Sequence, residues 1–302
     1  MKTFYSPDYV VDIGAHVFPT IKFAHAAQRL IVDGVLRPVD LVDPGVADAD
    51  VLSSIHEKQW VSKVIEGDMT LEDETRLEMR WSPSLALAHR KCSAGTLMAA
   101  RESLGTGLGL HIGGGSHHAF AGHGEGFCVF NDLALALETL RGEGAVERGA
   151  VVDLDVHQGN GTASLLRDRD GLSTFSMHDA QIYPFDGVGT VAKSTVDVAV
   201  EAGAEDAEYH KILQERLPAF LDDEKPSLVL YQAGVDVHES DKLGRFRLSS
   251  EGVARRDRFV AESVIKRGIA LVVTLGGGYG EDPVETGALH AQTIAAAIKA
   301  KG

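Results

Sequence analysis

The 302-residue sequence predicts an α/β fold with a central, mostly parallel sheet flanked by helices. Short β-branched runs alternate with helical patterns over nearly the whole chain. Most of these runs are continuously apolar, which is typical of parallel strands that are covered on both faces. Because no change in composition marks a linker, we expect residues 1–302 to form a single domain.

Six short apolar segments are expected to form the strands because they are rich in β-branched residues. They are residues 39–42, 108–112, 150–154, 172–176, 228–231 and 269–275. Six longer segments repeat apolar residues with the period of a helix. They are residues 19–32, 85–103, 132–141, 205–220, 249–266 and 285–299. Polar and glycine-rich stretches follow several strands, at the edge where a parallel sheet builds its site.

Charge and composition exclude several classes of protein. The chain has 29 Lys and Arg against 44 Asp and Glu, and its net charge of −15 repels nucleic acid and anionic lipid. The same field attracts cationic peptides, although an acidic balance also serves solubility. Two cysteines imply no disulfide framework, and the sequence has neither a secretory leader nor an apolar run long enough to span a membrane. We therefore expect a cytoplasmic protein.

Two adjacent histidines form the first polar cluster that follows an expected strand. They end the run Gly-Gly-Gly-Ser-His-His at residues 113–118. Such a pair can reach two depths of one pocket, one beside a reactive water and the other beside its departing group. Taken alone, the segment is equally consistent with a surface turn.

The second cluster, Asp-Leu-Asp-Val-His-Gln-Gly-Asn-Gly at residues 153–161, follows another expected strand. Residues i and i+2 of a strand share a face, so Asp155 and His157 are candidates to bind one cation. Carboxylate and neutral imidazole are both good ligands for Zn²⁺. Asp153 lies one step deeper on that face and could orient a ligand or a catalytic histidine. The alternative is a polar strand end that caps a helix, but three buried polar groups are unfavourable unless they are paired.

Two further clusters are weaker when taken alone. Asp236 follows the strand at residues 228–231 and offers a third metal ligand, although a lone Asp at such a place is more often a helix cap. The glycines at 276–278 let the backbone turn closely, and Tyr279 offers a phenolic donor. A tight turn with a half-buried tyrosine is the alternative. The sequence contains no nucleophile elbow, phosphate-binding loop or C-x-x-C pair.

In this order the clusters resemble the histone deacetylase superfamily of zinc-dependent amidohydrolases, from about Phe4 to the C-terminal helix. The resemblance is carried by the blocks at residues 113–119, 126–132, 153–161, 233–244 and 276–279. The form Asp-Val-His-Gln-Gly-Asn-Gly is most similar to the class IV branch and its bacterial relatives. The resemblance implies the single-domain arginase/deacetylase-like fold.

The resemblance also implies a role for each matching residue. The implied zinc ligands are Asp155, His157 and Asp236. The implied catalytic groups are His117, His118, Tyr279, Asp153 and Asn160, with Tyr279 as the oxyanion donor. The implied substrate-binding residues are Gly126, Phe127, Tyr183 and Leu243, with the two aromatic rings as channel walls. A structural monovalent cation, K⁺ or Na⁺, is implied near Asp153, Asp155, His157, Ser176 and Met177.

The sequence departs from the family pattern at several places. Many relatives have an acid at the position of Asn160, and since an amide carries no charge, we expect a lower pKa for His118 than in those relatives. Near His16, the cation is Lys22 where relatives often have Arg. The family pattern therefore does not indicate how product acetate would leave the site. Leu243 replaces the gatekeeping Glu of polyamine-selective members. The acid that grips the substrate backbone is one of Glu72, Asp73, Glu74 and Glu78.

These observations predict a zinc-dependent deacylase that acts on acyl-lysine in a protein or peptide. A small acetylated amine or another amide is the alternative substrate, and a catalytically silent acyl-lysine binding module is the alternative from another class. Fe²⁺ or Co²⁺ would fit the same ligands as Zn²⁺. The sequence does not indicate the length of the acyl chain or the oligomeric state.

Overall fold

The computed structural model describes residues 1–185 and 189–302, and its centre is one eight-stranded sheet. All neighbouring strands in it run parallel, in the order β2-β1-β3-β8-β7-β4-β5-β6. The strands are β1 (Thr3–Phe4), β2 (Leu41–Val42), β3 (Leu108–His111), β4 (Gly149–Asp153), β5 (Leu172–His178), β6 (Val196–Ala199), β7 (Leu228–Gln232) and β8 (Ala270–Thr274). The predicted α/β class with a parallel sheet is therefore confirmed.

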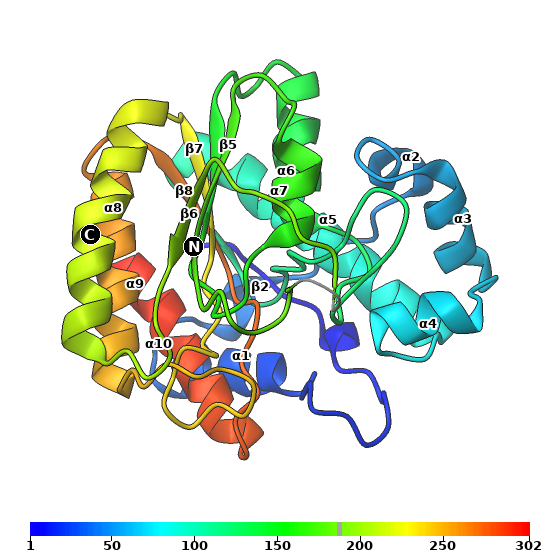
Figure 1. Cartoon of the computed structure of the whole chain (residues 1–302), viewed down its shortest axis with the longest axis horizontal. Coiled ribbons are helices and arrows are strands. Elements are labelled where there is room, and N and C mark those ends of the chain that lie inside the picture. The colour runs from blue at the N-terminus through cyan, green and yellow to red at the C-terminus, as the bar shows by residue number, and fades with distance from the viewer. Residues whose placement is uncertain (186–188) are drawn as a thin grey trace.

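Helices cover both faces of this sheet (Figure 1). One face carries α1 (Lys22–Val32), α8 (Asp206–Glu224), α9 (Ser250–Ile265) and α10 (Pro283–Lys301). The other carries α5 (Pro83–Thr106), α6 (Asp132–Gly142) and α7 (Asn160–Leu166). Beyond α5 lie the shorter α2 (Ala49–Leu52), α3 (Lys58–Glu66) and α4 (Leu71–Leu77), at the right of Figure 1. The described residues also form two short 3₁₀ helices, η1 (Pro7–Tyr9) and η2 (Pro38–Asp40).

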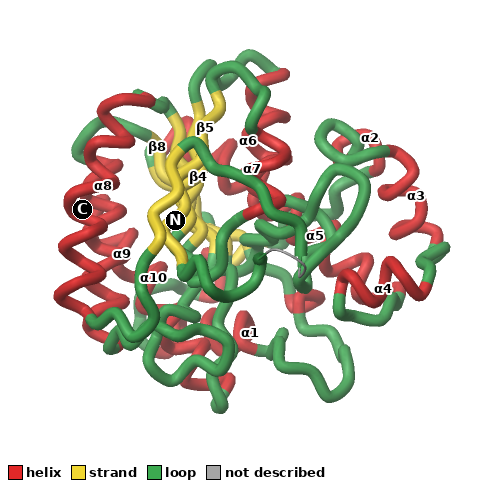
Figure 2. Tube along the Cα trace, in the orientation of Figure 1, coloured by secondary structure: helices red, strands yellow, loops and turns green. Residues whose placement is uncertain are grey.

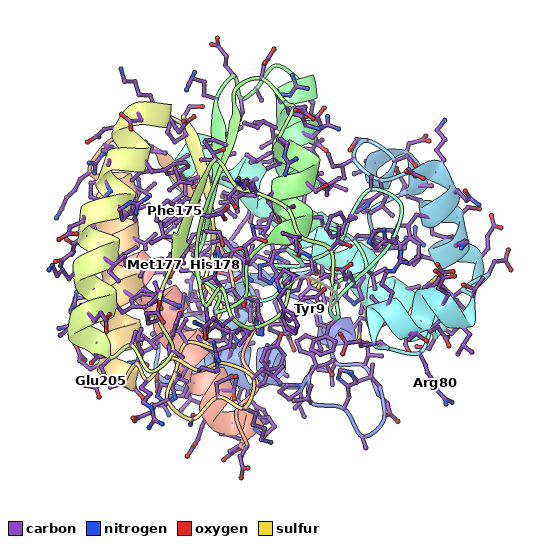
Figure 3. The ribbon with its side chains drawn as sticks, in the orientation of Figure 1. Tyr9, Arg80, Phe175, Met177, His178 and Glu205 are labelled. Carbon is purple, nitrogen blue, oxygen red and sulfur yellow. The ribbon has the colours of Figure 1, made fainter. Side chains whose placement is uncertain are left out.

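The continuous apolar strands bury both of their faces, as the sequence pattern predicts. Val152 of β4 packs in the cluster under α8–α10, whereas its neighbour Val151 packs in the cluster under α5 and α6. On β5, Phe175 and Met177 both lie in the first of these clusters. Figure 3 labels them on the strands left of centre, far from the exposed Arg80 at the right-hand rim. The sheet thus separates two apolar layers.

Several short elements differ from the sequence prediction. The segment 39–42 begins inside η2 and forms a strand only at its last two residues. β1 and β6 were not predicted, because β1 has two residues and β6 is an edge strand with only Val198 buried. The four short helices α2, α3, α4 and α7 were also not predicted, since brief amphipathic segments give little periodic signal. Within the described part of the chain, no helix has the length and apolarity that a bilayer crossing requires.

Long loops follow the central strands and gather at one edge of the sheet, as Figure 2 shows in green. The four polar clusters lie after β3, β4, β7 and β8, which are adjacent in the order β3-β8-β7-β4. Residues far apart in the sequence therefore meet beyond the carboxyl ends of these strands.

Candidate active site

A buried group of three potential metal ligands lies at this edge. One ligand atom from each of Asp155, His157 and Asp236 lies within 4.8 Å of the others. The sequence argument placed Asp155 and His157 on a strand, and that was wrong, because β4 ends at Asp153 and both residues lie in the loop that follows. The loop still turns the two side chains toward Asp236.

The donor set and the space around it fit a divalent cation such as Zn²⁺. His157 Nδ1 lies 3.0 Å from Asp155 Oδ1 and 3.2 Å from Asp236 Oδ2. Burial opposes the charge of this imidazole, but its bonds to both carboxylates raise the pKa of His157 to about 10. At Gly277 a side chain would not fit, because a Cβ there would come within 2.1 Å of Asp236 Oδ2.

Hydrogen bonds from the protein fix the two carboxylates. Asp155 Oδ2 accepts bonds from Gln232 Nε2 and from the backbone N–H of Gly277, each at 3.0 Å. Asp236 Oδ1 accepts a bond from the Val156 N–H at 3.0 Å. Outer partners of this kind hold ligands in one orientation, as in known metal sites.

The two adjacent histidines lie beside this group and have chemically different partners. His117 Nδ1 lies 2.7 Å from Asp153 Oδ2, and His118 Nδ1 lies 2.6 Å from Asn160 Oδ1. Despite burial, the carboxylates of Asp153 and Asp155 raise the pKa of His117 to about 9. Burial, together with the neighbouring His117 and His157, lowers the pKa of His118 well below its usual value. The pKa values of the two adjacent histidines are thus shifted in opposite directions, as in acid–base pairs of enzymes.

Asp132 at the start of α6 holds the glycine-rich loop that carries these histidines. Its carboxylate accepts bonds from the N–H groups of Gly115 and Ser116 at 2.9 and 2.7 Å. Gly115 has a φ of +85°, and a Cβ there would come within 2.7 Å of the Gly276 Cα. This position therefore needs glycine for both its conformation and its close approach to the next loop.

Aromatic rings line a narrow cavity beside the histidine pair. Its volume is about 60 Å³, and Phe127, Tyr279, Phe18 and both histidines of the pair are among its lining residues. The rings of Phe127 and Tyr279 are 5.9 Å apart, and those of Phe18 and Phe127 stack at 6.0 Å. Phe127 has a φ of +66°, an uncommon conformation for so bulky a residue. Backbone strain of this kind is concentrated at functional sites.

Of the remaining predicted substrate-binding residues, Gly126 and Tyr183 lie close to the cavity or the histidine pair, whereas Leu243 does not line the cavity. Gly126 lines the cavity, and the ring of Tyr183 lies edge-on to His118, with the centroids 4.9 Å apart. Leu243 is half-buried in the loop after β7 and is not among the residues that line the cavity. Its N–H donates to Asp241 Oδ1 at 2.9 Å, while Asp241 Oδ2 accepts a bond from the Tyr279 N–H at 2.6 Å.

The residues predicted to surround a monovalent cation lie on neighbouring strands. Asp153 of β4 is the register partner of Ser176 of β5, and Met177 follows on the same strand. Asp153 Oδ1 also accepts a bond from the Asp155 N–H at 3.1 Å. The cation site itself stays a prediction.

Lys22 is a fully buried cation behind the loop between β8 and α10, residues 275–282, which carries Tyr279 and is called the tyrosine loop below. Its Nζ donates to the carbonyl oxygens of Gly276 and Gly278 at 2.9 and 3.1 Å and lies 5.2 Å from the Tyr279 ring centroid. Burial lowers the pKa of Lys22 to about 8. From the sequence we noted this lysine only as a departure from a family pattern, whereas the structure shows that it connects α1 to the tyrosine loop.

Two site residues were not identified from the sequence. Arg256 of α9 is fully buried and donates to the carbonyl oxygens of Leu154 and Gly234, at 3.1 and 2.7 Å. These residues lie one and two positions before the potential metal ligands Asp155 and Asp236. Glu125 is a buried carboxylate bonded to Asn160. The signal for Arg256 was an Arg-Asp pair within an amphipathic helix, and the signal for Glu125 was an acid immediately before the glycine-aromatic block.

Fold and site together define an α/β protein with a buried candidate metal centre at the carboxyl edge of a parallel sheet. Comparison with known proteins identifies its family. Residues 16–295 match the histone deacetylase domain. The chain belongs to the histone deacetylase family of hydrolases.

Individual relatives agree with this assignment. An uncharacterized protein of Picosynechococcus sp. is 37% identical over 279 residues, which are 92% of each chain. Histone deacetylase 2 of Arabidopsis thaliana is 30% identical over 87% of this chain and 70% of its own. The crystal structure of the HDA15 HD domain superposes with a TM-score of 0.78 at 20% identity, over 99% of this chain and 91% of that one. This last likeness concerns the fold alone.

Proposed function

We propose that this chain is a zinc-dependent deacylase that removes acetyl or longer acyl groups from the side-chain amine of acyl-lysine. The observation that carries the proposal is the buried set Asp155, His157 and Asp236, which lies beside a histidine pair with unlike partners. Zn²⁺ held by these residues would polarise the substrate carbonyl and lower the pKa of an attacking water. The same donors accept Fe²⁺ or Co²⁺, so metal analysis belongs to the test.

His118 is the proposed general base and then general acid. Its Nδ1–H donates to Asn160 Oδ1, so the lone pair at Nε2 is available for a proton. His118 takes a proton from water as the new C–O bond forms, and it returns a proton to the lysine nitrogen as the C–N bond breaks. Such a group typically contributes ~10²- to 10⁴-fold to the rate. His117, held by Asp153, supplies positive charge beside it.

Tyr279 is the proposed donor to the oxyanion that develops on the substrate carbonyl. Its ring lies 6.2 Å from that of His157, and its loop is held by Lys22 and Asp241. A donor of this kind is worth ~3 kcal/mol because its bond strengthens in the transition state. Phe127 and Tyr183 are the proposed walls around the lysine methylene groups.

Glu78 is the proposed acid that binds the substrate backbone at the entrance. The other three candidates already have partners, because Glu72 pairs with Arg76, Asp73 with Lys63, and Glu74 accepts the Trp81 N–H. Within residues 1–185 and 189–302, the exposed Glu78 carboxylate has no such partner. Its backbone carbonyl contacts His16 Nε2 at 3.0 Å, and the ring of His16 packs edge-on against Phe127, the proposed channel wall.

The test is hydrolysis of matched lysine peptides and free amines that carry acetyl, octanoyl and myristoyl groups, using protein of measured zinc content. We expect turnover that falls at least ~100-fold in Tyr279→Phe, with zinc content unchanged. Turnover of free amines alone would favour a small acylated amine as substrate. Full activity of Tyr279→Phe would refute the mechanism, and zinc binding without hydrolysis of any substrate would indicate a silent binding module.

The proposal also covers a structural cation, the class of substrate and the location of the protein in the cell. A structural K⁺ or Na⁺ near Asp153 and Ser176 is part of the proposed site. The substrate is a protein, a peptide or a small amine rather than a nucleic acid, since the chain carries a net charge of −15. The cytoplasm is the proposed location, in keeping with the free Cys92 and Cys128.

A further inference from the structure

Glu125 is a buried carboxylate surrounded by hydrogen-bond donors. Its Oε1 accepts bonds from Asn160 Nδ2 at 2.8 Å, from the Tyr183 hydroxyl at 2.6 Å and from the Thr190 N–H at 3.0 Å. Its Oε2 accepts the Thr190 hydroxyl at 2.9 Å. Bonds in both directions with the backbone of Cys128 hold Glu125 in place. Because these side-chain partners donate, the site suits an ionised carboxylate.

This carboxylate and the Thr190 carbonyl together determine which way the amide of Asn160 points. Asn160 Nδ2 donates to Glu125 Oε1 and to the Thr190 carbonyl at 2.7 Å, so Oδ1 must face His118. In the flipped amide, Oδ1 would face a carboxylate and a carbonyl, and all three would be acceptors. The NH₂ group would then face His118 Nδ1, which would have to give up its proton to accept.

We propose that Glu125 is a positioning residue that fixes the Nδ1–H tautomer of His118 through Asn160. Glu125 also supplies a negative charge to His118 indirectly: the charge lies beyond Asn160 in the hydrogen-bond chain, whereas an acid at position 160 would contact His118 itself. This inference rests on the proposed function for the role of His118 as the base. In the other tautomer Nε2 would carry the proton, and His118 could not accept one from water.

The same geometry explains why the hydrogen-bond partner of His118 is an amide rather than an acid. An Asp at position 160 would place a second carboxylate about 3 Å from Glu125, and two such groups do not both stay ionised. Although burial opposes its charge, the bonds from Tyr183 and Thr190 and the nearby His123 hold the pKa of Glu125 well below its usual range. The two positions are therefore coupled, and substituting one changes what the other tolerates.

The kinetic test uses the zinc-loaded protein and four variants on one acyl-lysine peptide. We expect kcat to fall ~10- to 100-fold in Glu125→Ala, because the Asn160 amide loses its orientation. Glu125→Gln keeps an acceptor at Oε1 and should lose at most ~10-fold. Asn160→Asp should lose more than ~10-fold, and the double variant Asn160→Asp/Glu125→Gln should recover at least ~5-fold of that loss. Losses that simply multiply in the double variant would overturn the coupling.

Tyr183→Phe is the matched control, because it removes one donor to Glu125 without touching Asn160. We expect this variant to change KM more than kcat, whereas Glu125→Ala should change kcat more than KM. A kcat within twofold of the unsubstituted protein in Glu125→Ala would overturn the positioning role.

A spectroscopic measurement does not depend on turnover. In ¹⁵N-histidine-labelled, zinc-loaded protein, the His118 imidazole should show the Nδ1–H tautomer, with its signals assigned from His118→Phe. In Glu125→Ala we expect a mixture with the Nε2–H tautomer, and an unchanged spectrum would refute the inference. If the unsubstituted protein hydrolyses none of the acyl substrates, the proposed function fails. The spectra still decide whether Glu125 fixes the tautomer of His118 through Asn160.

Discussion

The buried Lys22 side chain illustrates how one residue can position the loop that carries the proposed oxyanion donor, Tyr279. Its charge is removed from water and is stabilised by two backbone carbonyls and by the faces of Phe18 and Tyr279. Since those carbonyls belong to Gly276 and Gly278, in the turn before Tyr279, the lysine holds the hydroxyl-bearing ring relative to the proposed metal ligands. Its contribution should therefore be to catalysis more than to stability.

We predict that Lys22→Met lowers kcat ~10-fold or more while it changes the free energy of unfolding by only ~1–2 kcal/mol. Methionine removes a buried charge, which favours folding, but leaves two carbonyls without donors, which opposes it. The measurements are steady-state kinetics and urea unfolding of both proteins. Lys22→Arg keeps donors at this place and should retain more activity. A kcat for Lys22→Met equal to that of the unsubstituted protein would contradict the positioning role.

The candidate site was predictable residue by residue where a motif carries its own chemistry. Asp155, His157 and Asp236 do converge, and the contacts His117–Asp153 and His118–Asn160 that the family resemblance implied are present. Lys22, Glu125 and Arg256 could not be assigned in this way, because their partners are backbone carbonyls or side chains brought near only by folding. A contact between α9 and the ends of β4 and β7 leaves no pattern in the sequence of either element.

At the scale of elements, Arg256 joins α9 to the loops that carry the proposed metal ligands. Its guanidinium donates to the carbonyls of Leu154 and Gly234, and its Nε donates to Asp257 Oδ1 at 2.8 Å. Asp257 also accepts the hydroxyl groups of Tyr231 and Thr293, both at 2.6 Å. One buried ion pair thereby connects α9, α10 and the carboxyl ends of two strands.

Breaking this pair should destabilise the protein strongly. We predict that Arg256→Met lowers the free energy of unfolding by ~3–5 kcal/mol, because Asp257 is left charged and buried without its cation. In Arg256→Met/Asp257→Asn no charge is left buried, the amide oxygen can still accept the Tyr231 hydroxyl, and the NH₂ group can donate to the Thr293 hydroxyl oxygen. The loss should therefore be smaller than in the single variant. Urea unfolding monitored by circular dichroism measures both. An Arg256→Met variant within 1 kcal/mol of the unsubstituted protein would contradict this account.

Elements were predictable in proportion to their length and burial. The long central strands and helices appear within a few residues of the predicted bounds, as with β8 at Ala270–Thr274 against 269–275. The strands β1 and β6 were not found because tertiary pairing, not local propensity, makes them strands. The segment at 39–42 has a β-branched pattern, but Pro38 starts a 3₁₀ turn whose third residue, Asp40, bonds back to Arg37. Local turn chemistry there outweighs the apolar pattern.

At the scale of the whole molecule, buried neutral histidines tie stability to pH. Burial lowers the pKa of His56 and His89 to about 4 and that of His111 to about 3. Above pH 7 these groups are neutral in both the folded and the unfolded chain and contribute no pH dependence. Between pH 6.5 and about 4, these three histidines bind protons in the unfolded chain but not in the folded one, so their contribution to the free energy of unfolding falls as pH falls.

His56 offers the cleanest measurement of this linkage, because its two ring nitrogens have defined partners. Nδ1 contacts the Phe120 carbonyl at 2.8 Å, and Nε2 accepts the Asn131 N–H at 2.9 Å, so the ring must be neutral. A glutamine at this position can supply one donor and one acceptor but does not titrate. From pH 7.5 to 4, we predict that the unsubstituted protein loses about 3 kcal/mol more of its unfolding free energy than His56→Gln does. Urea unfolding of both proteins at half-unit pH steps tests this prediction, and parallel curves would show that His56 binds protons equally in the folded and unfolded states.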